Sequence, residues 1–272
     1  MKTRLGLDAN LPVTDIVSDA IKLVWLQSGF VLSRFFPFML VLALIDWMGQ
    51  VLFPEQSGSI MPFVFMILSM LLGVVFAIAC HRFALADTSV PIAFKWSSDH
   101  WRYLWRGVQI GLVAGLVILL ALVVFGLLSP GLLGAATGST GGETPAISGP
   151  AIVVAIFALM AMMYVTARLS VTLPEIAVGR PSSLRRAWML SKGNGNRLVA
   201  VVWIVPVVLA LPFLAAYAVD STLMLFLGAL GTYIATLVSL ITLSLSYRFL
   251  KDLETESSGG SDTDSSDSGF SA

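Results

Sequence analysis

Long apolar runs separated by short polar segments make up most of this chain. Six of the runs are about 19 residues or longer, enough for a helix to cross roughly 30 Å of hydrocarbon. The predicted spans are residues 35–53, 60–85, 107–129, 150–173, 198–219 and 222–250. The pattern predicts an all-α fold, a polytopic membrane helix bundle with six transmembrane helices.

Residues 13–34 show a different pattern, in which apolar residues recur every three or four positions and polar residues take the opposite face. We expect a helix at the membrane interface that is capped by Thr14, in an N-terminal cytoplasmic segment covering residues 1–34. A helix that binds a partner is the alternative. No continuous apolar run follows Lys2 and Arg4, so a cleaved signal peptide is not expected.

Two connectors carry further short helices. Between spans two and three, Trp101 and Trp105 lie one helical turn apart among basic residues, which is typical of an interfacial helix. Basic residues mixed with aromatic residues can also bind nucleic acid. A chain this apolar favours contact with the membrane instead. Between spans four and five, Ser182 or Ser183 can cap a short helix and Gly193 can end it.

The even spans end alike. Arg82, Arg168 and Arg248 each precede an apolar residue at the end of a span and are separated by 86 and 80 residues. The chain is therefore expected to repeat one unit three times, an interfacial helix followed by a hairpin, with all hairpins inserted in the same sense. For each arginine alone, a side chain that reaches the headgroups is a sufficient explanation.

Composition and charge support this topology. Hydrophobic residues make up 57% of the chain and charged residues 12%, far from the roughly one quarter charged residues of soluble domains. All 16 Lys and Arg residues precede span one, lie in the two long connectors, follow span six, or stand at the connector or tail end of an even span. The positive-inside rule then places both termini in the cytoplasm.

The segment 251–272 is acidic and rich in Ser and Gly. Its composition predicts a disordered cytoplasmic tail, because few of its side chains can offset the entropy of ordering. Cys80 is the only cysteine, so an internal disulfide is impossible.

Candidate functional residues are few. Asp46 lies inside span one, and an intramembrane carboxylate is a candidate for transport or proton chemistry, although solvation near the adjacent loop also explains it. The spacing of Gly107, Gly111 and Gly115 allows close approach of a helix from a second copy or a partner membrane protein. Candidate contacts to anionic lipid headgroups are Arg82, Arg168, Arg185, Arg186, Lys192 and Arg197.

The motifs HExxH, paired CxxC, GxSxG and GxxxxGK(S/T) do not occur in the sequence, and no metal or cofactor is expected. The scarcity of ionisable groups favours a protein that is not an enzyme.

The connector between spans four and five resembles a bacterial six-span integral membrane family that includes the membrane domain found beside glycerophosphoryl diester phosphodiesterases. The resemblance rests on Arg168, Pro174-Glu175, Ser183, Ala187-Trp188, Ser191-Lys192-Gly193-Asn194 and Arg197, and on His81-Arg82-Phe83 with Trp101-Arg102-Tyr103-Leu104. It covers most of residues 30–250 and implies the six-span fold. The chain has no room for a soluble phosphodiesterase barrel, so that activity is not expected.

The sequence thus favours a multi-pass protein with a structural, assembly or lipid-associated role that contacts membrane lipids and not nucleic acid. A small transporter or permease subunit is the first alternative. A membrane-embedded enzyme of lipid metabolism is the second, and it would require Asp46, Tyr164, Arg168 and Glu175 to meet in one cavity.

Overall fold

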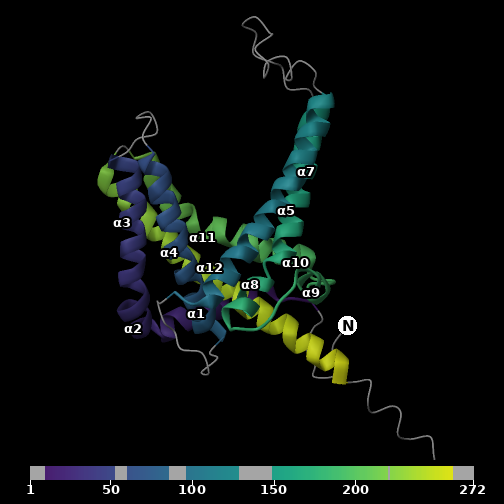
Figure 1. The fold of residues 1–272 in the computed structure, drawn as a ribbon. Helices are drawn as coiled ribbons and strands as arrows, with labels where there is room; N and C mark the ends of the chain where they lie inside the picture. The colour runs from purple at the N-terminus through teal and green to yellow at the C-terminus, as the bar shows by residue number, and fades with distance from the viewer. Residues whose placement is uncertain (1–9, 53–59, 86–95, 129–148, 220, 260–272) are drawn as a thin grey trace, which may run out of the picture.

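The computed structural model describes residues 10–52, 60–85, 96–128, 149–219 and 221–259. Within these ranges every regular element is a helix, and six helical stretches are long and apolar enough to cross a membrane (Figure 1). Such helices satisfy their backbone hydrogen bonds internally, as hydrocarbon requires. The predicted all-α, polytopic helix bundle is confirmed.

The chain begins with α1 (Val13–Leu26), and the spans follow. Span one combines α2 (Ser28–Phe30), the π-helix η1 (Val31–Phe35) and α3 (Phe36–Leu52). Spans two, three and four are α4 (Met61–Leu85), α5 (Ser98–Leu128) and α7 (Gly149–Leu169), the last followed by α8 (Thr172–Ala177) and α9 (Leu184–Leu190). Span five combines α10 (Gly195–Val199), the π-helix η3 (Ala200–Ile204), α11 (Val205–Leu214) and the 3₁₀-helix η4 (Ala215–Ala218); span six is α12 (Thr222–Gly259).

Consecutive spans pack against each other as α3 with α4, α5 with α7, and α11 with α12. Helix α12 also packs against α3 and α4, so the first and third pairs form one bundle. The α5–α7 pair diverges from that bundle (Figure 1), and none of the apolar window of Ser98–Val124 is buried. Its outward side chains are apolar, as a surface in contact with hydrocarbon requires.

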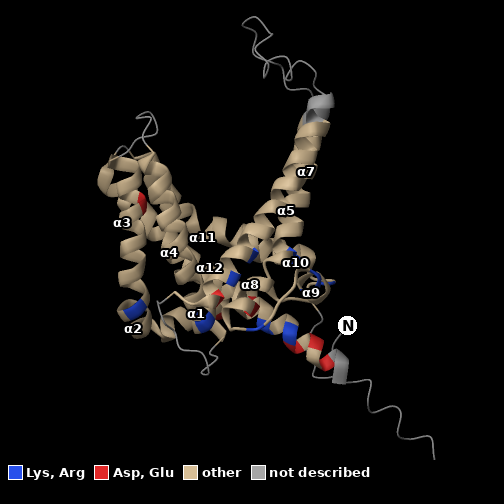
Figure 2. Ribbon diagram, in the orientation of Figure 1, with Lys and Arg blue, Asp and Glu red and all other residues tan. Residues whose placement is uncertain are grey.

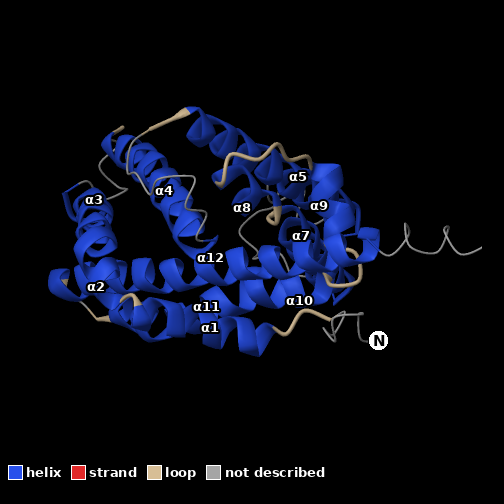
Figure 3. Cartoon of the chain, turned by 90° about the horizontal axis from the view of Figure 1, so that it is seen from below, coloured by secondary structure: helices blue, strands red, loops and turns tan. Residues whose placement is uncertain are grey.

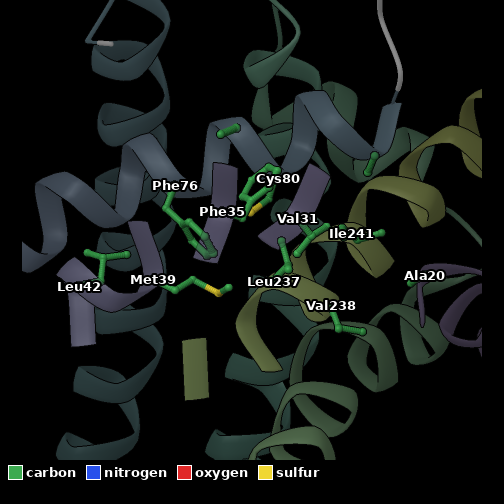
Figure 4. Close-up of a cluster of buried hydrophobic side chains, with 12 residues drawn as sticks. Ala20, Val31, Phe35, Met39, Leu42, Phe76, Cys80, Leu237, Val238 and Ile241 are labelled. Atoms are coloured by element: carbon green, nitrogen blue, oxygen red, sulfur yellow. The ribbon is translucent and has the colours of Figure 1, made fainter. Parts of the chain in front are cut away.

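The bundle's main core lies where η1, α3, α4 and α12 meet. Phe35 packs against Phe76 with ring centroids 6.1 Å apart, and Leu237 and Ile241 close the cluster from α12 (Figure 4). All four side chains are almost fully buried. This contact fixes the first hairpin on the last span, although the two are far apart in sequence.

Helix α1 lies along α12 on the face seen in Figure 3 and buries Ile16 and Ala20. Its polar side chains Asp15, Ser18, Asp19 and Lys22 are exposed, which agrees with the amphipathic pattern. The predicted cap was wrong, because Pro12 rather than Thr14 is the N-cap residue. Residues 28–34 belong to span one, so the boundary predicted at residue 34 was also too late.

The predicted separate interfacial helix before span three was also wrong. Within the described residues α5 is one continuous helix from Ser98 to Leu128, because nothing between Trp101 and Gly107 interrupts its hydrogen bonding. Spans one and five, in contrast, each contain a π-helical turn directly after a short first helix, at η1 and η3. The first and third units therefore share a local feature that the middle unit lacks.

Helix α12 continues to Gly259, past the predicted boundary at residue 250. Disorder was therefore wrongly predicted for residues 251–259. An ion pair at 3.0 Å between Glu254 and Arg186 ties this extension to α9, a contact that composition does not reveal. Residues 260–272 lie outside the described residues.

The described Lys and Arg residues gather toward one end of the molecule, where α1, α9 and the end of α12 lie (Figure 2). Trp101 and Trp105 on α5 are exposed. The arrangement is that of a membrane protein with one strongly basic end.

Candidate functional site

Arg82, at the end of α4, is 6% exposed and fully engaged inside the protein. Its Nε donates to the carbonyl of Ala177 at 2.7 Å, and a terminal nitrogen donates to Asp99 at 2.9 Å. The side chain therefore joins α4 to α8 and to the first turn of α5.

Arg168, at the end of α7, is buried to the same degree. Its Nε donates to Ser191 Oγ at 2.8 Å, a terminal nitrogen donates to the carbonyl of Trp188, and the guanidinium lies 3.7 Å from the Trp188 ring centroid. The other terminal nitrogen donates to Tyr164 Oη at 3.3 Å. Arg168 thus holds α9 against α7 through two residues of the connector.

Glu175 on α8 is 4% exposed and accepts hydrogen bonds from Arg186 Nε at 2.8 Å and Ser182 Oγ at 2.5 Å. The hydrogen bond and charge of Glu175 raise the pKa of Arg186. Ser183 caps α9 by accepting from the backbone N–H of Arg186, which confirms one of the two predicted caps. Gly193, with φ of +82°, follows the helix as expected.

The turn after α9 binds the start of the chain. Arg197 donates to the carbonyl of Leu11 at 2.7 Å, and Asn194 Oδ1 accepts from the Leu11 backbone N–H at 2.7 Å. Arg185 and Lys192, in contrast, are exposed and make no hydrogen bond or ion pair with the described residues. Of the six predicted headgroup contacts, these two have their donors free, and lipid contact by any of the six stays a prediction.

Asp46 lies between the first and third hairpins. It accepts a hydrogen bond from Tyr233 on α12, whose hydroxyl also lies 3.2 Å from Ser69 on α4. Tyr164 and Arg168 meet as described, but Glu175 and Asp46 each have other partners. The four residues that a membrane-embedded enzyme would need therefore do not form one site.

Gly107, Gly111 and Gly115 lie on the exposed surface of α5. A Cβ added at any of them would meet no heavy atom within 4 Å, so the predicted close approach does not occur within the chain.

His81, which precedes Arg82 near the end of α4, is completely buried. Its Nδ1 lies 2.7 Å from Ser244 Oγ, and its Nε2 lies 3.1 Å from Tyr103 Oη. These contacts link α4, α12 and α5 in the interior, where no substrate can reach the ring. Among the described residues, no group of three or more His, Cys, Asp or Glu side chains could hold a metal ion.

A cavity of about 360 Å³ opens at the basic end of the molecule, and sequence reasoning missed it. It is lined by Leu85, Val178, Arg180, Tyr247, Arg248, Lys251 and Asp252. Leu85, Val178 and Arg248 lie at or soon after the ends of the three repeated units, so the repeat was the only available signal. Neither the convergence of three cations nor the cavity itself follows from linear spacing.

The six long apolar helices and the basic end of the molecule together define a multi-pass helical membrane protein. No family model matches the chain, and neither does any curated protein or solved structure. The resemblance to the six-span family stays a prediction.

Proposed function

We propose that this chain is a non-catalytic protein of the bacterial cytoplasmic membrane, with a structural, assembly or lipid-associated role and its basic end in the cytoplasm. The observation that carries the proposal is the one-sided distribution of all 16 Lys and Arg residues. That end would face the anionic headgroups of the inner leaflet, where each nearby cation contributes about 1 kcal/mol of attraction.

Arg185 and Lys192 are the clearest headgroup contacts. Both are exposed beside the short helix α9, and neither charge is neutralised by a described residue. Trp188 exposes part of its ring on the same helix, which suits the boundary between headgroups and acyl chains. The connector thus combines cations with an amphipathic aromatic side chain, as lipid contact requires.

Retention of lipid by the purified protein tests the proposal. Native mass spectrometry would compare phosphatidylglycerol with phosphatidylcholine bound to wild type and to the Arg185→Gln, Lys192→Gln double variant. We expect the variant to retain less phosphatidylglycerol and unchanged phosphatidylcholine. The charge-preserving Arg185→Lys, Lys192→Arg variant is the control. Equal phosphatidylglycerol retention by wild type and the glutamine variant would refute a lipid role for this connector.

A small transporter is the second candidate, and the hydrogen-bonded group of Asp46, Tyr233 and Ser69 inside the bundle favours it. Polar groups at such positions often mark a substrate or proton pathway. Proteoliposomes containing a pH-sensitive dye would report proton flux. Flux that is present in wild type and lost in Asp46→Asn would support transport, whereas equal flux in protein-free liposomes would refute a proton pathway.

A further inference from the structure

The three repeated arginines have different surroundings. Arg82 and Arg168 use their guanidinium groups on carbonyls and side chains within the protein. Arg248, at the same place in the third unit, is exposed, lines the cavity and makes no hydrogen bond or ion pair with a described residue. The third arginine is therefore available to a ligand where the other two are not.

The charge of the cavity favours an anion. Arg180, Arg248 and Lys251 contribute three positive charges and Asp252 one negative charge. The end of α4 at Leu85 adds partial negative charge, which opposes an anion. At the end of α8 this effect is offset, because the Ala177 carbonyl accepts from Arg82. The three full positive charges outweigh the Asp252 carboxylate and the partial negative charge at the end of α4.

Tyr247 adds an independent indication. Its side chain is 2% exposed, and its buried hydroxyl donates no hydrogen bond to a described residue, while Arg180 is placed to donate one to the phenol oxygen. Buried hydroxyl groups nearly always have a partner. A ligand oxygen in the cavity could accept this hydrogen bond while Arg248 and Lys251 neutralise its charge.

We propose that the cavity binds a phosphate ester, an inference that rests on the lipid-associated role proposed above and names its ligand. Phosphate oxygens match the forked donors of arginine. Two sources carry this group, an anionic lipid headgroup and a small soluble phosphate ester. Leu85 and Val178 form an apolar wall that suits the glycerol and first acyl carbons of a lipid.

The test measures dissociation constants of the full-length chain in zwitterionic nanodiscs by isothermal titration calorimetry. The probes are dioctanoyl phosphatidic acid, glycerol 3-phosphate and inorganic phosphate. We expect the double variant Arg248→Gln, Lys251→Gln to raise the dissociation constant of dioctanoyl phosphatidic acid roughly tenfold or more, because two cations are lost. The control, Lys22→Gln with Arg102→Gln, removes the same charge from exposed side chains elsewhere and should change the constant less than twofold.

Two single variants keep the proposal testable if the double variant does not fold, and they test whether binding weakens or tightens as expected. Tyr247→Phe removes only the hydroxyl and should weaken binding of dioctanoyl phosphatidic acid about threefold or more. Asp252→Asn removes the opposing carboxylate and should tighten binding. Unchanged constants in both would overturn the proposal even if the double variant failed to fold.

The remaining outcomes separate this proposal from the broader one. If the cavity and control double variants weakened lipid binding equally, the attraction between the protein and the anionic lipid would be unspecific. That result would overturn the cavity site and leave the lipid-associated role intact. Selective weakening, with normal lipid retention in Arg185→Gln, Lys192→Gln, would keep the cavity and refute the connector's role. Equal affinity for glycerol 3-phosphate and dioctanoyl phosphatidic acid would identify a soluble ester as the ligand. No binding of any probe by wild type would overturn the proposal.

Discussion

The guanidinium of Arg168 lies 3.7 Å from the centre of the Trp188 ring and donates to the Trp188 carbonyl. One side chain therefore holds both the backbone and the ring of a residue 20 positions away. The contact connects the end of a membrane span to the short helix α9, which carries the exposed Arg185 and is followed by the exposed Lys192.

Replacing Arg168 tests this contact. Arg168→Gln should lower the free energy of unfolding by about 2–4 kcal/mol, because it leaves buried acceptors unpaired and removes the cation–π contact. The stability of Arg168→Lys should lie between those of wild type and Arg168→Gln, because lysine keeps the charge but lacks the forked N–H donors of arginine. Unfolding monitored by tryptophan fluorescence in detergent measures the change. Arg185→Gln, at an exposed side chain, should stay within about 0.5 kcal/mol, and an equal loss in both variants would contradict the prediction.

Gly195 should be intolerant of any side chain. A Cβ there would lie 2.5 Å from Tyr164 Cε2, closer than van der Waals contact allows. We expect Gly195→Ala to destabilise the protein by about 1–3 kcal/mol through this clash. Gly73→Ala in α4 is the matched control, because nothing lies within 4 Å of its Cβ, and helix propensity should make it neutral or stabilising by up to about 1 kcal/mol. Thermal unfolding distinguishes the two, and equal stability would place Tyr164 elsewhere.

The Glu175–Arg186 pair should show strong coupling. Arg186→Met leaves the buried carboxylate of Glu175 without its cation and should cost about 2–4 kcal/mol. Adding Glu175→Gln should recover part of that loss, which a double-mutant cycle measures. Because Glu175 raises the pKa of Arg186, the folded state loses this stabilisation only when the pH rises through that raised pKa. The arginine should therefore add no pH dependence between about pH 5 and 9. Additive losses in the cycle would refute the coupling.

The topology can be tested with single cysteines, because Cys80 is buried. An impermeant maleimide added to intact spheroplasts should label Asp220→Cys and leave Lys192→Cys unlabelled. Permeabilisation should expose Lys192→Cys, since it lies on the basic side. The reverse labelling pattern would contradict the proposed orientation.

The three exposed glycines of α5 predict self-association. We propose that Gly107, Gly111 and Gly115 allow the α5 helices of two copies to pack closely. Mass photometry in mild detergent should show an oligomer for wild type and a monomer for Gly111→Leu. Leu120→Ala, an exposed change on the opposite face of α5, should leave the oligomer intact. A monomeric wild type would refute the proposal.

Local patterns predicted elements well where one physical requirement dominated. The six apolar runs had to become helices, since hydrocarbon leaves no other partner for their backbone. Ser183 and Gly193 took the cap and turn positions that their chemistry favours. The prediction failed where a contact between residues far apart in sequence was involved. Composition predicted disorder after residue 250, whereas the structure has a helix there in which Glu254 pairs with Arg186.

The sequence by itself determined the fold class, the spans and the one-sided charge, because these depend on short-range hydropathy and on counting residues. It could not distinguish Arg82 and Arg168, which are buried, from Arg248, which lines an open cavity, since all three occupy equivalent places in the repeat. Only the tertiary structure decided this, because the availability of an arginine depends on which acceptors the neighbouring helices bring within hydrogen-bond distance. For Arg82 and Arg168 those acceptors come from α8 and α9, and no described residue supplies one to Arg248.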